Sequence, residues 1–245
     1  MKRRYFTFLE LTISIVVIAF LGFMLLNFWS ARSRATSAEM AKRIMCINNL
    51  KQLGLALAMY AEDYDGYLVP GADADETQLW CGRRENDAFQ LQGGLTEYFG
   101  GNEIPDCRLA DFVNENNNIH NGGYGYNARY LGTSDDSVEP PEPVKMSRVS
   151  RPEATAAFAD AAGLAASGVL MPSWKISGPQ APDGSPDIHF RHQRMASVGW
   201  VDGHVLLERL KFAKPHHAGF TALQCREEYQ LGWWGDDTDD LFDLD

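Results

Sequence analysis

The side chains in this sequence that are best suited to metal binding or proton transfer are histidines and aspartates in its last quarter. His192 lies ten residues before Asp202, which is followed by Gly203 and His204, and His189 lies just upstream. Imidazole and carboxylate groups bind zinc and transfer protons, so a metal site or a catalytic site is conceivable here. The sequence has no G-x-S-x-G or H-E-x-x-H motif. We therefore predict a structural role, in which the His192 imidazole hydrogen-bonds a hairpin group such as Asp202.

The hairpin itself is predicted from the pair Asp202-Gly203. Residues 196–201 and 204–208 on either side are rich in apolar side chains. An Asp-Gly pair between two such runs is typical of a type I′ turn, because both central residues of that turn need a positive φ. We expect two antiparallel strands joined at this point.

A second group of oxygen ligands lies at the acidic tail. Its members Asp236, Asp237, Asp239 and Asp240 follow the pair Trp233-Trp234. Calcium takes six to eight oxygen ligands, often from aspartates and backbone carbonyls. The spacing lacks the glycine and the final glutamate of an EF-hand, and a solvated acidic end is the alternative. Calcium is the one cofactor that the residues suggest.

Four cysteines are spread widely along the chain, at positions 46, 81, 107 and 225. There is no C-x-x-C pair, so a structural zinc site of the usual spacing is not expected. An oxidising compartment would permit disulfides. Four cysteines allow three complete pairings, and the sequence does not choose among them.

The element that must organise these groups is an apolar segment near the start of the chain. The 21 residues from Leu11 to Ala31 carry no charge, and a helix of that length spans about 31 Å, enough to cross a hydrocarbon core. No A-x-A-like cleavage site follows, so we expect a retained anchor. Glu10 stands at its edge. A carboxylate there either hydrates at the headgroup level or meets a partner, because its burial in lipid costs about 2.5–3.5 kcal/mol.

The helix is expected to continue beyond the anchor. Cys46, Leu50, Leu53, Leu57, Tyr60 and Tyr64 are spaced by three or four residues and form one stripe. The pair Asp65-Gly66 is a suitable stop. Strands are predicted at 124–127 and in the hairpin, whereas the alanine-rich run 154–162 is compatible with a buried strand or a short helix. The expected fold is therefore α+β: a long N-terminal helix, its first half transmembrane, packed on a small antiparallel sheet whose other face is exposed.

Charge limits the classes of partner. The formal net charge of −11 argues against a nucleic-acid partner, which would favour a basic surface. Lys2, Arg3 and Arg4 precede the apolar segment, and this favours a cytoplasmic N-terminus. The remaining part, of ordinary size for one domain, would then lie on the other side of the membrane.

The order of these features resembles a known family. Lys2-Arg3-Arg4, then the residues FTFLE from Phe6 to Glu10, then a long apolar helix, resembles the N-terminus of type IV prepilins and type II secretion pseudopilins. The residues from Cys46 to Pro70 and the H-x9-DG pattern that ends at Gly203 resemble a pilin-like subgroup of planctomycete and lentisphaeral bacteria.

This resemblance implies a structural subunit and not an enzyme, and it implies a strand over 154–162. A prepilin peptidase would cut between Tyr5 and Phe6, where the family usually has glycine in place of Tyr5, and Phe6 would become N-methylated. Glu10 would pair with the new amine of a neighbouring subunit and direct assembly into a helical filament. Major pseudopilins bind calcium in a C-terminal loop, which favours calcium at the acidic tail.

The implied organisation has four parts: a leader over 1–5, a transmembrane and assembly helix over 6–31, its continuation over 32–66, and a pilin-like head over 67–245. The protein would be a single-pass inner-membrane protein with a periplasmic head, and its partners would be further copies, the peptidase and a secretion or pilus machinery. The alternative is a membrane-anchored periplasmic binding domain or enzyme that forms no filament.

Overall fold

A computed structural model describes residues 8–73, 75–85, 88–90, 92, 94–99, 104–110, 121–132, 143–182 and 184–244. The chain divides into two compact units, Met1–Lys42 and Arg43–Asp245. The elements in chain order are α1 Phe8–Asp63, β1 Gln78–Leu79, β2 Gly82–Glu85, β3 Ala88–Gln90, η1 Thr96–Phe99, β4 Tyr124–Tyr126, η2 Ala128–Gly132, η3 Met146–Arg148, β5 Ala156–Asp160, β6 Gly163–Leu164, β7 Leu170–Met171, β8 Ile188–His189, β9 Met195–Trp200, β10 Val205–Arg209, α2 Ala222–Glu227 and β11 Leu231–Gly232. The fold is α+β, as the sequence predicts.

Helix α1 is one uninterrupted element of 56 residues. It ends where the sequence predicts, because Asp65 and Gly66 adopt positive φ values of 53° and 85°. The Gly66 N–H then donates to the Ala61 carbonyl at 2.7 Å, which satisfies one of the last helical acceptors. Glycine suits this position because it has no Cβ to clash in the left-handed region.

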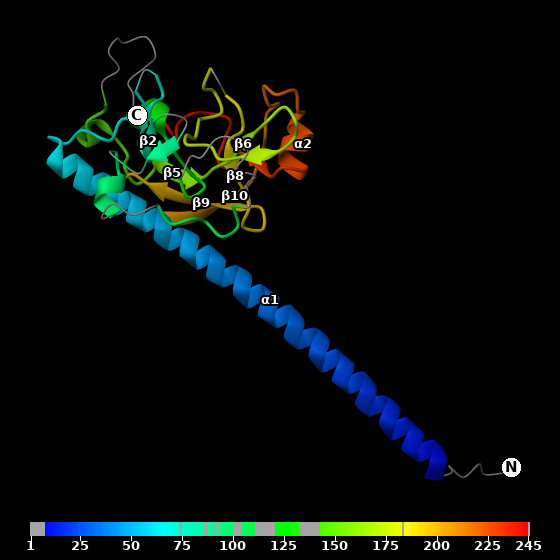
Figure 1. Ribbon diagram of the computed structural model, residues 1–245. Coiled ribbons are helices and arrows are strands. Elements are labelled where there is room, and N and C mark those ends of the chain that lie inside the picture. Colours follow the sequence, from blue (N-terminus) through cyan, green and yellow to red (C-terminus); the bar gives the residue numbers. More distant parts are fainter. Residues whose placement is uncertain are drawn as a thin grey trace. The chain divides into compact units, whose positions relative to one another are not determined.

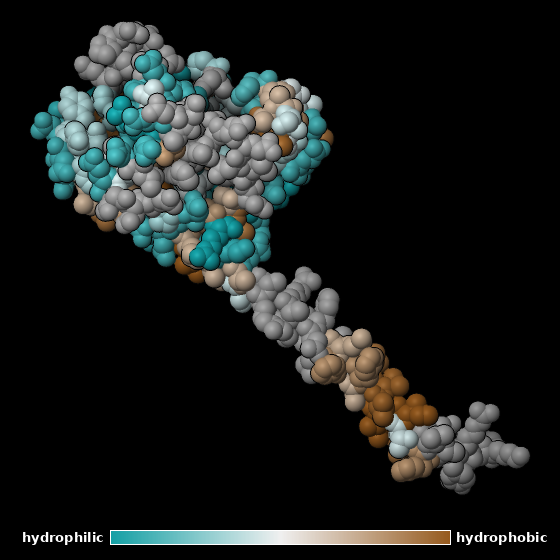
Figure 2. Space-filling model, viewed as in Figure 1, coloured by the Kyte–Doolittle hydropathy of each residue, from teal (hydrophilic) through white to brown (hydrophobic). Residues whose placement is uncertain are grey.

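The unit Met1–Lys42 consists, where described, of the first part of α1, and most of its side chains from Leu11 to Met24 are apolar, as the brown part of the helix in Figure 2 shows. Phe8, Ile18 and Phe23 are 84%, 69% and 66% exposed. A search of the described residues for a helix of sufficient length and hydropathy to cross a membrane finds none. The predicted cleavage position between Tyr5 and Phe6 lies outside the described residues, and so does the side chain of Glu10.

The second unit is built on a four-stranded antiparallel sheet of order β10-β9-β5-β4. Three smaller sheets surround it: β1-β2-β3, β11-β8 and β6-β7. The predicted strands at 124–127 and 154–162 correspond to β4 and β5, which pair from Tyr124–Asp160 to Tyr126–Phe158. The predicted hairpin corresponds to β9 and β10, paired from Gly199–Val205 to Met195–Arg209.

The last turns of α1 run along this sheet (Figure 1). The predicted stripe provides the contact: Cys46, Leu50 and Leu53 are fully buried, and they share a core with Tyr124 and Phe158 of the sheet.

Two glycines allow the close approach of helix and sheet. A Cβ on Gly54 would lie 3.3 Å from the Gly203 Cα, and a Cβ on Gly199 would lie 3.8 Å from the Leu50 Cβ. Helix and sheet therefore meet almost backbone to backbone at the hairpin.

The other face of the sheet is buried, which corrects the expectation of an exposed face. All of β5 is buried, and so is β9 from Ala196 onwards. A second core covers this face; it includes Trp233, Trp234 and Phe242 together with Val198 and Trp200 of β9. The C-terminal segment supplies this layer, so Trp233 and Trp234 are part of the core.

The predicted type I′ turn at Asp202-Gly203 is wrong in detail. The Gly203 N–H donates to the Trp200 carbonyl at 2.9 Å, and Trp200 pairs through its N–H with His204 at 2.9 Å. Gly203 has a φ of 87°, whereas Asp202 is not among the residues with positive φ. The connection is thus a three-residue loop with a single left-handed glycine, a common alternative to the two-residue turn.

Candidate functional site

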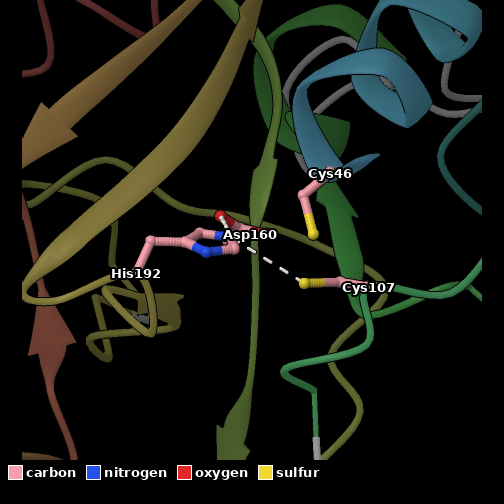
Figure 3. Close-up of side chains that lie close together, drawn as sticks. All are labelled: Cys46, Cys107, Asp160 and His192. Carbon is pink, nitrogen blue, oxygen red and sulfur yellow. Dashed lines mark hydrogen bonds and ion pairs between the residues drawn. The ribbon is translucent and has the colours of Figure 1, made fainter. Parts of the chain in front are cut away.

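Four buried side chains converge between α1 and the sheet: Cys46, Cys107, Asp160 and His192 (Figure 3). One potential ligand atom from each lies within 4.8 Å of all the others. His192 Nε2 lies 3.1 Å from Asp160 Oδ2 and 3.8 Å from Cys107 Sγ. Among the described residues, this is the one group of three or more such side chains that could hold a metal ion.

Regular elements position two of the four residues. Cys46 belongs to the buried stripe of α1, whose helical spacing directs its thiol at the sheet. Asp160 is the last residue of β5 and follows four buried residues of that strand. Cys107 comes from a segment without regular structure, which is fixed because the Cys107 N–H donates to the Gly122 carbonyl at 2.9 Å.

His192 is positioned by a tight turn that joins the β8 segment to β9. The N–H groups of His192 and Met195 donate to each other's carbonyls at 2.9 and 3.3 Å. The two intervening residues, Gln193 and Arg194, have φ values of 58° and 64°. This is the pattern of a type I′ turn, formed here without the usual glycine or asparagine.

The conformation of that turn is costly, because a left-handed residue other than glycine costs about 1–2 kcal/mol. Side chains from both helices support it. Arg43 of α1 donates to Gln193 Oε1 at 3.2 Å, and Arg194 forms a two-pronged pair with Glu227 of α2 at 2.7 and 3.2 Å. These side-chain contacts hold the turn in its strained conformation, as is common for strained backbone next to a functional site.

Asp160 is the anionic centre of the site. Its side chain is fully buried and accepts a 2.6 Å hydrogen bond from the Ser197 N–H. Arg191 Nε lies 3.5 Å from Asp160 Oδ1. Burial alone would raise the pKa of this carboxyl, but the Arg191 guanidinium, His192 and the Ser197 N–H together hold the pKa below its ordinary value.

The two thiols differ in acidity. A hydrogen bond from Cys46, against the effect of burial and with help from His192, lowers the pKa of Cys107 to about 5. The same hydrogen bond and burial raise the pKa of Cys46 far above its ordinary value. Burial lowers the pKa of His192, but its hydrogen bonds to Asp160 and Cys107 outweigh this and raise the pKa to about 9.

This geometry does not suit a catalytic triad. In a triad, the base contacts the nucleophile through one ring nitrogen and its orienting carboxylate through the other. Here Asp160 and Cys107 both face Nε2 of His192, while Nδ1 has no hydrogen-bond partner among the described residues. All four side chains are also buried, so a substrate would have no direct access.

The other residues of the predicted histidine cluster lie apart from this site. Asp202 pairs with His204 and not with His192: His204 Nδ1 lies 2.6 Å from Asp202 Oδ1, and both side chains are more than a third exposed. His189 is buried in β8 beside Arg191. The prediction that Asp202 is the partner of His192 is wrong, because the loop directs Asp202 back onto its own backbone, where Oδ1 accepts from the His204 N–H at 3.1 Å.

Among the described residues, the tail aspartates join no group of three or more side chains that could hold a metal ion. Asp237 pairs with Lys214 at 2.6 Å, and Asp239 accepts from the Gln180 N–H at 2.8 Å and from the Tyr130 hydroxyl at 2.5 Å. These carboxylates fasten the tail to neighbouring loops. Asp236 and Asp240 lie in the same segment and join no group of potential ligands.

Three members of the site, Cys46, Cys107 and Asp160, are absent from the sequence-based prediction. All four cysteines have free, buried thiols, but only the structure brings Cys46 and Cys107 together. Asp160 could have been found from the sequence, because it directly follows the apolar run Ala156-Ala157-Phe158-Ala159. If that run is a central strand, the carboxylate must be buried, and a buried carboxylate needs a cation or hydrogen-bond donors.

A separate open pocket of about 380 Å³ lies elsewhere on the second unit. Ser185 and His217, which line it, are in hydrogen-bond contact. A carboxylate in its wall, Asp187, accepts from the backbone N–H and the hydroxyl of Ser177, each at 3.2 Å. The pocket thus places a serine and a histidine in contact.

Comparison with known proteins gives one family match. A family described as SBP_bac_10, a protein of unknown function (DUF1559), matches residues 37–79. The matched segment covers the second half of α1, including Cys46, and continues to β1. No curated protein and no solved structure matches the chain.

Proposed function

We propose that this protein is a pilin-like subunit that assembles through α1 into a filament of a type II secretion or type IV pilus-like machine. The observation that carries the proposal is the first part of α1, which is apolar on all sides. Ile15, Val16, Val17 and Ile18 are consecutive and each is at least 48% exposed. Four consecutive helical residues point in four directions about 100° apart, so cover is needed all around the helix.

Further copies of the same helix are the occupant that we propose for this surface. A helix that is apolar all around is stable only when it is buried. A bundle of identical helices covers every side at once, and the inner membrane would cover the uncharged segment 11–31 before assembly. The family that matches residues 37–79 is found in planctomycete pilin-like proteins, which supports the same conclusion.

The processing steps follow from the N-terminal residues. Cleavage between Tyr5 and Phe6 would create an amine four residues before Glu10, that is, about one helical turn away. That amine, methylated on Phe6, would supply the cation that a carboxylate beside an apolar helix requires. Between staggered subunits the same pairing would fix the register of each new subunit.

The test is the substitution Glu10→Ala in the full chain, expressed with a prepilin peptidase and its assembly machinery. We expect the variant to be inserted and its head to fold, with sheared filaments reduced at least tenfold. Glu39→Ala, which removes a carboxylate from α1 outside the apolar segment, is the matched control and should assemble normally. Normal assembly of Glu10→Ala, with an N-terminus still at Met1 by mass spectrometry, would overturn the proposal in favour of an anchored binding domain or enzyme.

A further inference from the structure

We propose that Cys46, Cys107, Asp160 and His192 form a structural zinc site that fastens α1 to the sheet. The first argument is geometric. Zinc ligands at about 2.3 Å for sulfur and 2.0–2.2 Å for nitrogen and oxygen, placed at tetrahedral corners, are roughly 3.3–3.8 Å apart. The observed separations of His192 Nε2 from Asp160 Oδ2 and from Cys107 Sγ are 3.1 and 3.8 Å. Small side-chain movements would bring all four atoms onto one ion.

The second argument is the charge of the surroundings. A divalent cation together with the buried Arg191 guanidinium balances two thiolates and the Asp160 carboxylate, with a neutral imidazole as the fourth ligand. Arg191 is held beside the site, because it also donates to the carbonyls of Gly123 and Ala161. Two thiolates, an imidazole and a carboxylate form a donor set that zinc accepts and that hard cations such as calcium or magnesium do not.

The third argument is the presence of groups that orient the ligands. The Ser197 N–H donates to the Asp160 carboxylate at 2.6 Å. Tyr124, which shares the core of Cys46, is held in place because its hydroxyl oxygen accepts from the Asn49 amide at 3.1 Å. Hydrogen bonds such as the one from the Ser197 N–H hold metal ligands in place and contribute to affinity.

A disulfide between Cys46 and Cys107 explains less of the site. A disulfide would use only the two sulfur atoms, bonded at about 2.05 Å. It would not explain why the Asp160 carboxylate and the His192 imidazole face the same point. A metal ion uses all four donor atoms and requires only Nε2 of His192. Because the site lies wholly within Arg43–Asp245, it is independent of filament assembly.

The experiment is zinc analysis of the full chain, produced in detergent with zinc in the medium and with a tag that contains no histidine or cysteine. We expect about one zinc per chain. Cys107→Ser and His192→Gln should each retain less than about a tenth of it, because loss of even a supporting group lowers affinity 10–100-fold. Cys225→Ser is the matched control: Cys225 is also buried, but it belongs to a separate core, so the variant should keep its zinc.

A second measurement on the unaltered chain guards against variants that do not fold. Removal of the ion with a chelator and addition of Co²⁺ should give the visible absorption of tetrahedral cobalt together with a sulfur-to-cobalt charge-transfer band. Trace zinc and no such spectrum would overturn the proposal. Recovery of Cys46 and Cys107 as a disulfide, with no metal in the protein purified without reductant, would overturn it as well.

Discussion

Two aspartate–histidine pairs in this protein allow a sharp test of what burial contributes to an ion pair. Asp202 and His204 are 2.6 Å apart, whereas Asp160 and His192 are 3.1 Å apart. Distance alone would rank the first pair as the stronger. The side chains of the second pair are fully buried, however, while those of the first are 35% and 38% exposed.

We predict that Asp160→Asn destabilises the protein far more than Asp202→Asn. Removal of one partner from a buried charge pair leaves the other charge uncompensated, which costs about 3–5 kcal/mol. In Asp160→Asn the uncompensated groups are Arg191 and His192. An exposed pair contributes roughly 0–1 kcal/mol, because water screens it. For a domain of this size, Asp160→Asn should lower the melting temperature by roughly 6–20 °C, whereas Asp202→Asn should lower it by less than about 4 °C.

The assay is thermal unfolding of both full-chain variants in detergent, followed by tryptophan fluorescence and by circular dichroism. A chelator should be present, so that only contacts within the protein are compared. Equal destabilisation by the two substitutions, or a larger effect of Asp202→Asn, would refute the argument that burial and not distance determines the contribution of each pair.

Two further substitutions test buried polar groups. Asn127→Ala should lower the free energy of unfolding by roughly 1–3 kcal/mol for each carbonyl that loses its donor, those of Ala156 and Phe242; chemical denaturation measures this, and an effect no larger than the roughly 1 kcal/mol expected for the exposed helix cap Thr221→Ala would contradict it. Burial and Arg191 lower the pKa of His189 to about 3. Below about pH 6.5 the unfolded chain therefore binds a proton that the folded chain does not. As the pH decreases from 6.5 to 3, the free energy of unfolding decreases by up to about 1.4 kcal/mol per pH unit. His189→Gln should reduce that slope in unfolding curves recorded from pH 7 to 4.5, whereas the exposed control His204→Gln should keep it.

The elements that the sequence predicts well are those with a strong periodic signal. The α1 stripe has helical spacing and is buried from Cys46 to Leu57, and the stop at Gly66 follows from the conformational freedom of glycine. The apolar runs on either side of Asp202-Gly203 are sufficient to predict a hairpin. These signals are local, so a single sequence contains them.

What the sequence could not provide depends on long-range contacts. Cys107 lies in an irregular segment and meets His192 across 85 residues. The type I′ turn that aims His192 is formed by Gln193 and Arg194, which are not residues typical of that turn. Tertiary contacts with Arg43 and Glu227 override the local preference there, and no pattern in the sequence predicts such contacts.

The way the last described residues enter the core determines when the head can fold during synthesis. The Ala156 N–H donates to the Leu241 carbonyl at 2.8 Å, and the Ser150 N–H donates to the Leu244 carbonyl at 2.9 Å. The Asn127 amide reaches Phe242 across 115 residues. Nascent chains of this protein therefore leave the ribosome with α1 and β5 complete but uncovered. Because such long-range topologies fold slowly and expose apolar surface until they close, the second unit can complete its core only after the segment that contains Leu241, Phe242 and Leu244 has been synthesised.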